Sequence, residues 1–253
     1  MVTPLRKYIP SWEVTEMIKL TPHPDWALEL IDYLQPYKER IVNSNFFEVL
    51  RSGSLRKKQF QWALINFFPL IESFPQYMGL NLSKLQPDGS KWNRKTRLWL
   101  MLNLNVERRH AAWWRNFAAG FGVTEQMLDE AFPPPAEVDA INHYLWHIST
   151  HGSLAESISA VNYAIEGPTG EWTKKLCGSF KRYAGVEGIV INKRTMQWVA
   201  AHASYDDKHP YQALEIIKAY AVTQEEQRKV KQAAQRAMEY YAIALETSYQ
   251  YFK

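Results

Sequence analysis

Apolar residues recur along this chain at intervals of three and four positions, the spacing of side chains that share one face of an α-helix. Strand-like alternation is nearly absent, and glycines and grouped prolines mark where the helical runs stop. These breaks predict helices over residues 25–51, 56–84, 92–119, 136–150, 153–166, 170–184, 193–208, 211–221 and 224–251. The last helix begins with Thr223 and Glu226, which have the spacing of a capping box.

The sequence contains no low-complexity linker and no internal repeat that would divide it into separate domains. A chain of 253 residues with 46% hydrophobic content can bury one sizeable core. We therefore predict a single all-α domain that covers residues 1–253, with its core in about 25–251.

Net charge, apolar runs and cysteine content limit the kinds of partner and the cellular compartment that we expect. A net charge of +4 is small for this length and does not favour a nucleic-acid partner. No apolar run is long enough to cross a membrane, and the first residues lack the apolar stretch of a signal peptide. A single cysteine, Cys177, excludes an internal disulfide and a thiolate zinc cage, and it fits a reducing compartment. We expect a cytoplasmic protein with no membrane partner.

The segment HASYDDKHP holds the densest group of candidate metal ligands. On a continuous helix, Asp206 and His209 fall within about 40° of His202, whereas Asp207 points about 140° away. The two histidines would then lie about 10 Å apart along the axis, a spacing that suits two neighbouring ions better than one. Pro210 disfavours α conformation at His209, so the segment could deform to reach the metals. The alternative is a polar helix end in solvent, and this segment alone does not decide between the two.

Glu107 and His110 form a second candidate group, in NVERRHAAWW. Their spacing of three places them side by side on a helix, as in the Glu-x-x-His motif of di-iron carboxylate bundles. The motif is common by chance, and Glu107 could instead pair at the surface with Arg108 or Arg109. The apolar residues around it favour burial, and a buried Glu and His require partners.

Two further carboxylates are candidates. Glu166 shares a polar helix face with Asn162, and it is either the last residue of a helix before Gly167 or a carboxylate that faces the other groups. Glu72 is an isolated acid among aromatic and aliphatic residues, and it could be a ligand, a group that supports the ligands, or the partner of a buried arginine. Oxygen and imidazole ligands without thiolate suit iron or manganese. A ferritin-type bundle would require a second Glu-x-x-His, which the sequence lacks.

Three more histidines, His143, His147 and His151, follow one another at intervals of four along one predicted helix face. No carboxylate is interleaved with them, and two helical turns separate the ends of the series. We therefore favour packing or surface roles for them over a shared metal ion.

Five segments together resemble a known family. PLIESFPQYMGLNL, NVERRHAAWW, FGVT, NYAIEGPTGEW and HASYDDKHPYQALEII are similar, in this order and spacing, to the UndA-type medium-chain fatty-acid decarboxylases. More widely they resemble the haem-oxygenase-like di-iron oxidases, which are related to TenA and PqqC. The resemblance covers about residues 25–222 and implies a seven-helix haem-oxygenase-like bundle. Its metal ligands and catalytic residues would be Glu107, His110, Glu166, His202, Asp206 and His209, and Glu72 matches a family glutamate near the metals.

The resemblance also implies an activity. Two Fe(II) ions would act with O2 as co-substrate in the oxidative decarboxylation of a medium-chain fatty acid, a small-molecule carboxylate, to a terminal alkene. The electron donor is not identified by the sequence, and related bundles commonly form homodimers. An apolar chain would suit an aromatic lining, although these residues could equally belong to the core: Phe67, Phe68, Trp113, Trp114, Trp146 and Tyr163.

Three other functions are known or conceivable for bundles of this kind. A same-family oxidase could act on an amino acid by N-oxygenation or C–C cleavage, and a non-catalytic binding or regulatory protein could use the same bundle. TenA-type thiamin hydrolysis requires a nucleophilic cysteine in the pocket, and Cys177 lacks a matching sequence context.

Overall fold

The structure, a computed structural model, describes residues 18–130, 133–204 and 208–251. Its α-helices are α2 (Asp25–Val42), α3 (Asn45–Ser52), α4 (Lys57–Asn66), α5 (Phe68–Ser83), α6 (Lys91–Gly120), α7 (Glu125–Glu130), α8 (Ala136–His151), α9 (Leu154–Ile158), α10 (Glu166–Leu176), α11 (Gln197–Ser204), α12 (Lys208–Tyr220) and α13 (Gln224–Gln250). The described ranges also contain the π-helix η2 (Ser159–Tyr163) and the 3₁₀ helices η3 (Cys177–Tyr183) and η4 (Val186–Gly188). These described ranges contain no strand, so the all-α prediction is confirmed.

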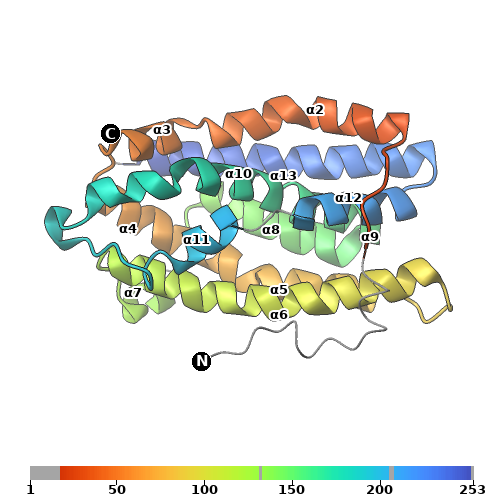
Figure 1. Cartoon of the computed structure of the whole chain (residues 1–253), viewed down its shortest axis with the longest axis horizontal. Helices are drawn as coiled ribbons and strands as arrows, with labels where there is room; N and C mark the ends of the chain where they lie inside the picture. Colours follow the sequence, from red (N-terminus) through yellow and green to blue (C-terminus); the bar gives the residue numbers. More distant parts are fainter. Residues whose placement is uncertain (1–17, 131–132, 205–207, 252–253) are drawn as a thin grey trace.

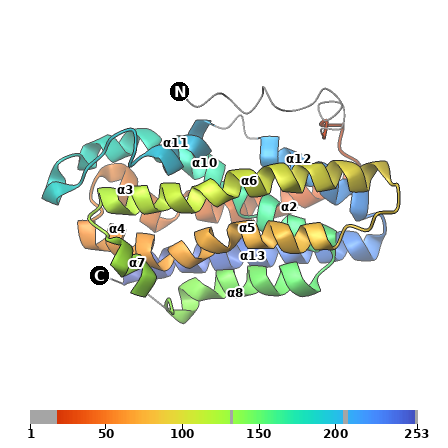
Figure 2. The same cartoon turned by 90° about the horizontal axis from the view of Figure 1, so that it is seen from below.

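The long helices run roughly along the long axis of the molecule (Figure 1). Helices α2 and α13 lie along one side, and α5 and α6 lie against each other along the opposite side. Helix α8 packs on both α13 and α5, as Figure 2 shows from below. Between these layers α10 packs on α11, which in turn contacts α6. Helices far apart in sequence therefore meet around the centre of the bundle.

Several helices end where the sequence predicts continuation. The predicted helix 25–51 consists of two helices, α2 and α3. The predicted helix 56–84 divides at Phe67 into α4 and α5. It divides there because Pro69, in the first turn of α5, has no amide hydrogen to donate to the carbonyl four residues earlier. The short helix α7 was not predicted. The capping box at Thr223 is confirmed: its hydroxyl accepts from Glu226 N, and its own amide donates to the Glu226 carboxylate.

Two of these differences change the expected geometry of the site. Glu166 is the first residue of α10, not the last of the preceding helix, because Pro168 is tolerated in a first turn and Thr169 N bonds to Ile165 O. Likewise His202 lies on α11 and His209 near the start of α12, where Pro210 occupies the first turn. The angular relationship expected for His202, Asp206 and His209 on one continuous helix depends on residues 205–207, which lie outside the described residues.

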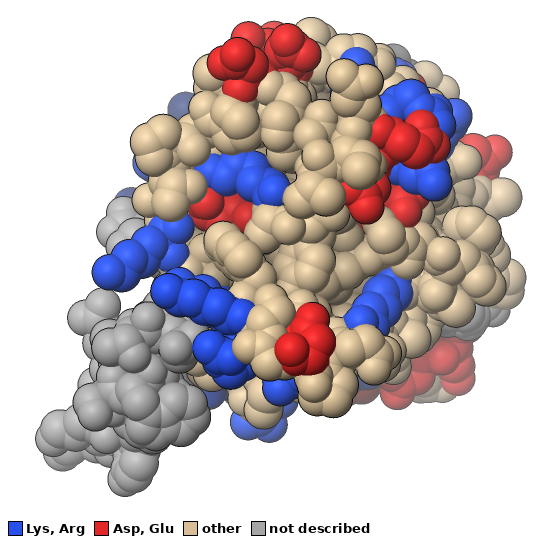
Figure 3. Space-filling view, turned by 90° about the vertical axis from the view of Figure 1, so that its right-hand side faces the viewer, with Lys and Arg blue, Asp and Glu red and all other residues tan. Residues whose placement is uncertain are grey.

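The core is apolar and lies between the helix layers. Fully buried side chains from different helices include Tyr77, Leu100, Ile141, Leu145 and Ile158. The face in Figure 3 carries acidic and basic side chains interspersed among uncharged ones, in keeping with the net charge of +4. Among the described residues, no helix is both long and apolar enough for a membrane span.

Candidate metal centre

Glu107 and His110 lie on the inner face of α6. The buried positions of this helix around them include Asn103, Trp114 and Phe117, at alternating steps of four and three, so the apolar periodicity turns both groups toward the core. Glu107 is 5% exposed and His110 is 4% exposed. The His110 Nδ1 lies 2.7 Å from Glu107 Oε2. The alternative of a surface pair between Glu107 and a neighbouring arginine is therefore wrong.

The hydrogen bond to Glu107 leaves the other ring nitrogen of His110, Nε2, able to bind a metal ion. When Nδ1–H donates to the carboxylate, Nε2 carries the lone pair, which is the usual arrangement of a metal-binding histidine. This Nε2 atom is buried and has no hydrogen-bond partner among the described residues. A buried polar atom without a partner is costly in a folded protein, and a bound metal ion would satisfy it.

His202 approaches the same point from α11. Its Nδ1 lies 2.8 Å from Trp198 O, and its ring centre lies 4.6 Å from that of His110. An imidazole nitrogen lies about 2.0–2.1 Å from a bound metal ion and the ring centre about 1.1 Å further, so two rings on one ion have centres about 4.5 Å apart at a right angle and about 5.2 Å apart at a tetrahedral angle. The two rings are thus spaced as rings that share an ion.

Glu166 and His209 form a second pair beside the first. The His209 Nδ1 lies 3.7 Å from Glu166 Oε2, and Asn162 Nδ2 donates to Glu166 Oε1 at 2.6 Å. Asn162 belongs to the π-helix η2, a conformation that is frequent at functional sites. The irregular turn places the amide of Asn162 where it orients the carboxylate at the start of α10.

Burial and mutual contact shift the ionisation of these groups. Burial would raise the pKa of Glu107, but the adjacent His110 imidazole and its hydrogen bond outweigh burial and hold that pKa below its usual value. Burial raises the pKa of Glu166, against the contact with His209, and the Glu107 carboxylate raises it further. Burial and the neighbouring His110 lower the pKa of His202 to about 3, so this imidazole is neutral at pH 7. Neutral imidazole is the form that binds metals.

An apolar cavity of about 90 Å³ reaches these groups. Its polar lining includes Glu107, His110, Glu166 and His202, four of the predicted ligands. Of the six aromatic residues expected around it, Phe67 and Trp114 are among its lining residues, and Phe68, Trp113, Trp146 and Tyr163 are not. Aromatic lining residues that the sequence did not single out are Phe46, Phe47, Phe60, Phe74, Phe117, Trp172, Phe180, Trp198 and Tyr241. His202 also lines a second, outer hollow of about 360 Å³ together with Lys38 and Lys174.

The described part of the chain brings the predicted ligands together in pairs. No three of the described His, Cys, Asp or Glu side chains lie close enough to form a metal site on their own. The sixth predicted ligand, Asp206, and its neighbour Asp207 lie outside the described residues. The donors that are described are carboxylate oxygens and imidazole nitrogens without a thiolate, a set that suits iron or manganese. They therefore fit an iron site to which further ligands are added.

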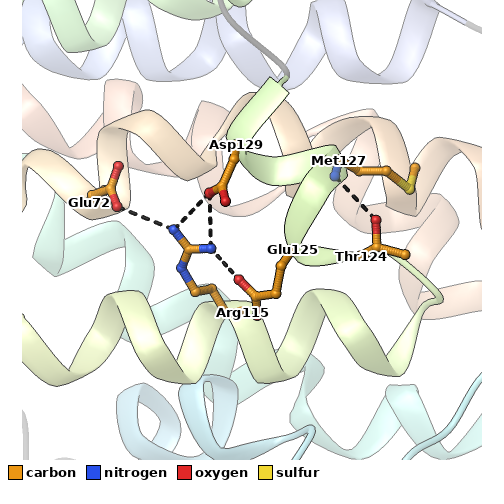
Figure 4. A network of polar contacts seen from close by, with 6 residues as sticks. All are labelled: Glu72, Arg115, Thr124, Glu125, Met127 and Asp129. Atoms are coloured by element: carbon orange, nitrogen blue, oxygen red, sulfur yellow. Dashed lines mark hydrogen bonds and ion pairs between the residues drawn. The ribbon is translucent and has the colours of Figure 1, made fainter.

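Glu72 is not among the residues that line the cavity. Its side chain is 55% exposed and is 3.5 Å from Arg115, which also contacts Glu125 and Asp129 of α7 (Figure 4). The Arg115 guanidinium covers the ring of Phe68 at 4.5 Å. Of the three roles that the sequence left open for Glu72, these contacts match the partner of an arginine. Its apolar neighbours in sequence face the core from the other side of α5, and its partner is an arginine that is itself partly exposed.

The chain resembles known proteins over most of its length. The family model described as iron-containing redox enzymes matches residues 61–242. A search of curated proteins found no significant match.

Solved structures share the fold. A TenA homologue from Pseudomonas syringae pv. tomato is 33% identical, with a TM-score of 0.84, and the match covers 92% of this chain and 99% of that one. A domain of unknown function with a haem-oxygenase-like fold from Shewanella denitrificans is 14% identical with a TM-score of 0.68, over 91% of this chain and 94% of that one. A putative TenA-like thiaminase from Sulfolobus solfataricus is 12% identical with a TM-score of 0.64, over 91% and 98%. The predicted haem-oxygenase-like fold is thereby confirmed.

Proposed function

We propose that this chain, which belongs to the family of iron-containing redox enzymes, is a non-haem di-iron oxidase that decarboxylates a medium-chain fatty acid to a terminal alkene. The observation that carries the proposal is the apolar cavity whose lining includes Glu107, His110, Glu166 and His202. A substrate with an apolar chain and an oxidisable head group fits this division between apolar wall and ligand-type side chains.

The proposed iron ligands are the two pairs Glu107–His110 and Glu166–His209, together with His202 and Asp206. Bound Fe(II) would supply the capacity to bind and reduce O2. The protein residues orient the ligands: the carboxylate of Glu107 fixes His110, the Trp198 carbonyl fixes His202, and Asn162 fixes Glu166. Three carboxylates would offset most of the four positive charges of two Fe(II) ions and leave a net attraction for an anionic head group.

The proposed reaction requires two electrons from an external donor, as the following count of atoms and electrons shows. Loss of CO2 and of one β-hydrogen from a saturated acid RCH2CH2COOH gives RCH=CH2, two protons and two electrons. Reduction of O2 to two waters takes four electrons, so a donor must supply the other two. The chain's part is to hold the acid in a site without bulk water, with its carboxyl end toward Glu107 and Glu166 and its hydrocarbon along the aromatic wall.

Thiamin hydrolysis is not part of this proposal, although one structural neighbour is described as a putative thiaminase. Cys177, the single cysteine, opens the 3₁₀ helix η3 and is not among the residues that line the cavity. A nucleophile has to contact the bound substrate, so this thiol does not meet that requirement.

An O2-uptake screen tests the proposed function. The protein is loaded anaerobically with two equivalents of Fe(II), and O2 consumption is followed after addition of single fatty acids and amino acids. We expect uptake that depends on a medium-chain acid, with undecene formed from dodecanoate. Uptake with an amino acid in place of the fatty acids would assign a different substrate to the same site. If none of these compounds triggers uptake, the oxidase proposal is refuted.

A further inference from the structure

The outer face of α8 carries three exposed histidines, His143, His147 and His151. Two of them are close neighbours: the ring centres of His147 and His151 are 5.0 Å apart and the rings are inclined by 47°. The first histidine is already engaged, because its Nε2 lies 3.1 Å from Asp139 Oδ2 one turn earlier. The three side chains are thus divided into one ion pair and one pair of adjacent imidazoles.

The spacing of the His147–His151 pair matches two ligands of one ion. Two imidazole rings on one ion have centres about 4.5 Å apart at a right angle and about 5.2 Å apart at a tetrahedral angle. The observed 5.0 Å lies within this range, so both rings could bind an ion with small rotations of exposed side chains. His143 and His151, at i and i+8, are about 12 Å apart along the helix, too far for one ion to join all three.

We propose that His147 and His151 form a surface site for a divalent late transition-metal ion, separate from the candidate iron centre. Two imidazoles supply the protein ligands, and water completes the coordination. None of the residues that line the iron-site cavity belongs to α8, so the two sites are distinct.

The ligand chemistry selects the ion. Imidazole suits Cu(II), Ni(II) and Zn(II), and affinity of a given site rises from Fe(II) through Ni(II) to Cu(II). The pair has neither a thiolate nor a carboxylate to favour a harder ion. We therefore expect Cu(II) to bind most tightly, followed by Ni(II) and Zn(II), with Fe(II) weakest.

Retention on a chelating resin charged with Ni(II) tests the site without interference from the iron centre. An ion fixed to a resin reaches exposed histidines, whereas His110 is buried. The protein without a purification tag should be retained and should elute with imidazole. Holding two ligands on one helix strengthens binding by about a hundredfold over a single ligand, so H147Q and H151Q should each lose retention. H143Q is the matched control, because it removes an exposed histidine of the same face and should be retained like the wild type.

The retention of the three variants shows which pair of histidines binds the ion. Retention of H147Q or H151Q equal to that of the wild type, or failure of the wild type to bind, would overturn the proposal. Loss of retention in H143Q and H147Q but not in H151Q would place the ion on the preceding pair and would also overturn it. In solution, Cu(II) below one equivalent should broaden first the backbone amide NMR signals of residues 147–151. Unchanged thermal unfolding of the three variants excludes misfolding as the cause.

Discussion

The side-chain amide of Asn162 donates a 2.6 Å hydrogen bond to the Glu166 carboxylate, and the two residues come from different helical segments. Asn162 belongs to the π-helix, and Glu166 opens α10. The bond fixes one carboxylate oxygen, while the other faces His209. Asn162 is therefore a positioning residue for a proposed iron ligand.

Replacement of this amide should reduce iron binding more than it reduces stability. We expect Asn162→Ala to weaken iron binding by about 10–100-fold, the usual cost of losing an outer hydrogen-bond partner of a metal ligand. The matched control is Ser159→Ala, which removes the buried hydroxyl that bonds to Val230 O from the same π-helix. Both variants should lose about 1–3 kcal/mol of unfolding free energy. Iron titration and thermal unfolding of the two variants separate the effects, and equal iron affinities would contradict the positioning role.

The proximity of His110 and His202 leads to a second prediction. If they share an ion, His110→Ala and His202→Ala should each lower the iron retained after anaerobic loading and desalting, and the double variant should lose little more than either single one. Such non-additivity is expected of groups that act through one partner. His143→Ala, on the outer face of α8, should retain the wild-type amount of iron. Independent and additive losses would show that the two imidazoles bind different ions.

Glu72 should be dispensable for the chemistry. Its carboxylate belongs to the exposed cluster around Arg115, where an ion pair contributes about 0–1 kcal/mol. Glu72→Gln should therefore leave iron content and O2 uptake unchanged, whereas the similarly conservative Glu107→Gln should abolish substrate-dependent uptake. A large loss of iron in Glu72→Gln would restore the original expectation that this residue supports the metals.

The size of the cavity should set the chain length of the substrate. Ala63 is 6% exposed and lines the cavity wall, so Ala63→Leu would fill part of its 90 Å³. We expect the preference to shift from dodecanoate toward shorter acids such as octanoate, with an overpacking cost of about 1–3 kcal/mol. The ratio of O2 uptake with the two acids measures the shift and corrects for any loss of active protein. An unchanged ratio would mean that the acyl chain lies elsewhere.

Local patterns predicted the local structure of this protein. The spacing of Glu107 and His110 within an apolar helix gave both their shared face and their burial, because three to four residues make one turn. The capping box at Thr223 could be predicted because it depends only on the spacing between Thr223 and Glu226. Glu166 was misplaced within its helix because a proline two residues later can follow a helix end or occupy a first turn, and the sequence does not distinguish these.

The arrangement of the site could not be read from one segment. His110 and His202 meet because α11 packs on α6, and the aromatic wall combines faces of several helices. Such contacts depend on tertiary packing, which periodicity does not encode. Glu72 illustrates the same limit. Its apolar neighbours along the sequence suggested that it would be buried, but its own face of α5 points outward. The resemblance to a family led to the proposed set of ligands. The structure then showed which of them are neighbours: Glu107 with His110, and Glu166 with His209.

A single-turnover experiment tests the central claim most directly. The protein loaded with two Fe(II) per chain is mixed with dodecanoate and then with O2 in the presence of a reductant, and undecene, CO2 and O2 consumed are quantified. We predict undecene and CO2 in equal amounts, with one O2 consumed per undecene, and no undecene from His202→Ala. O2 consumption at the same rate with and without dodecanoate, with no alkene formed, would contradict it.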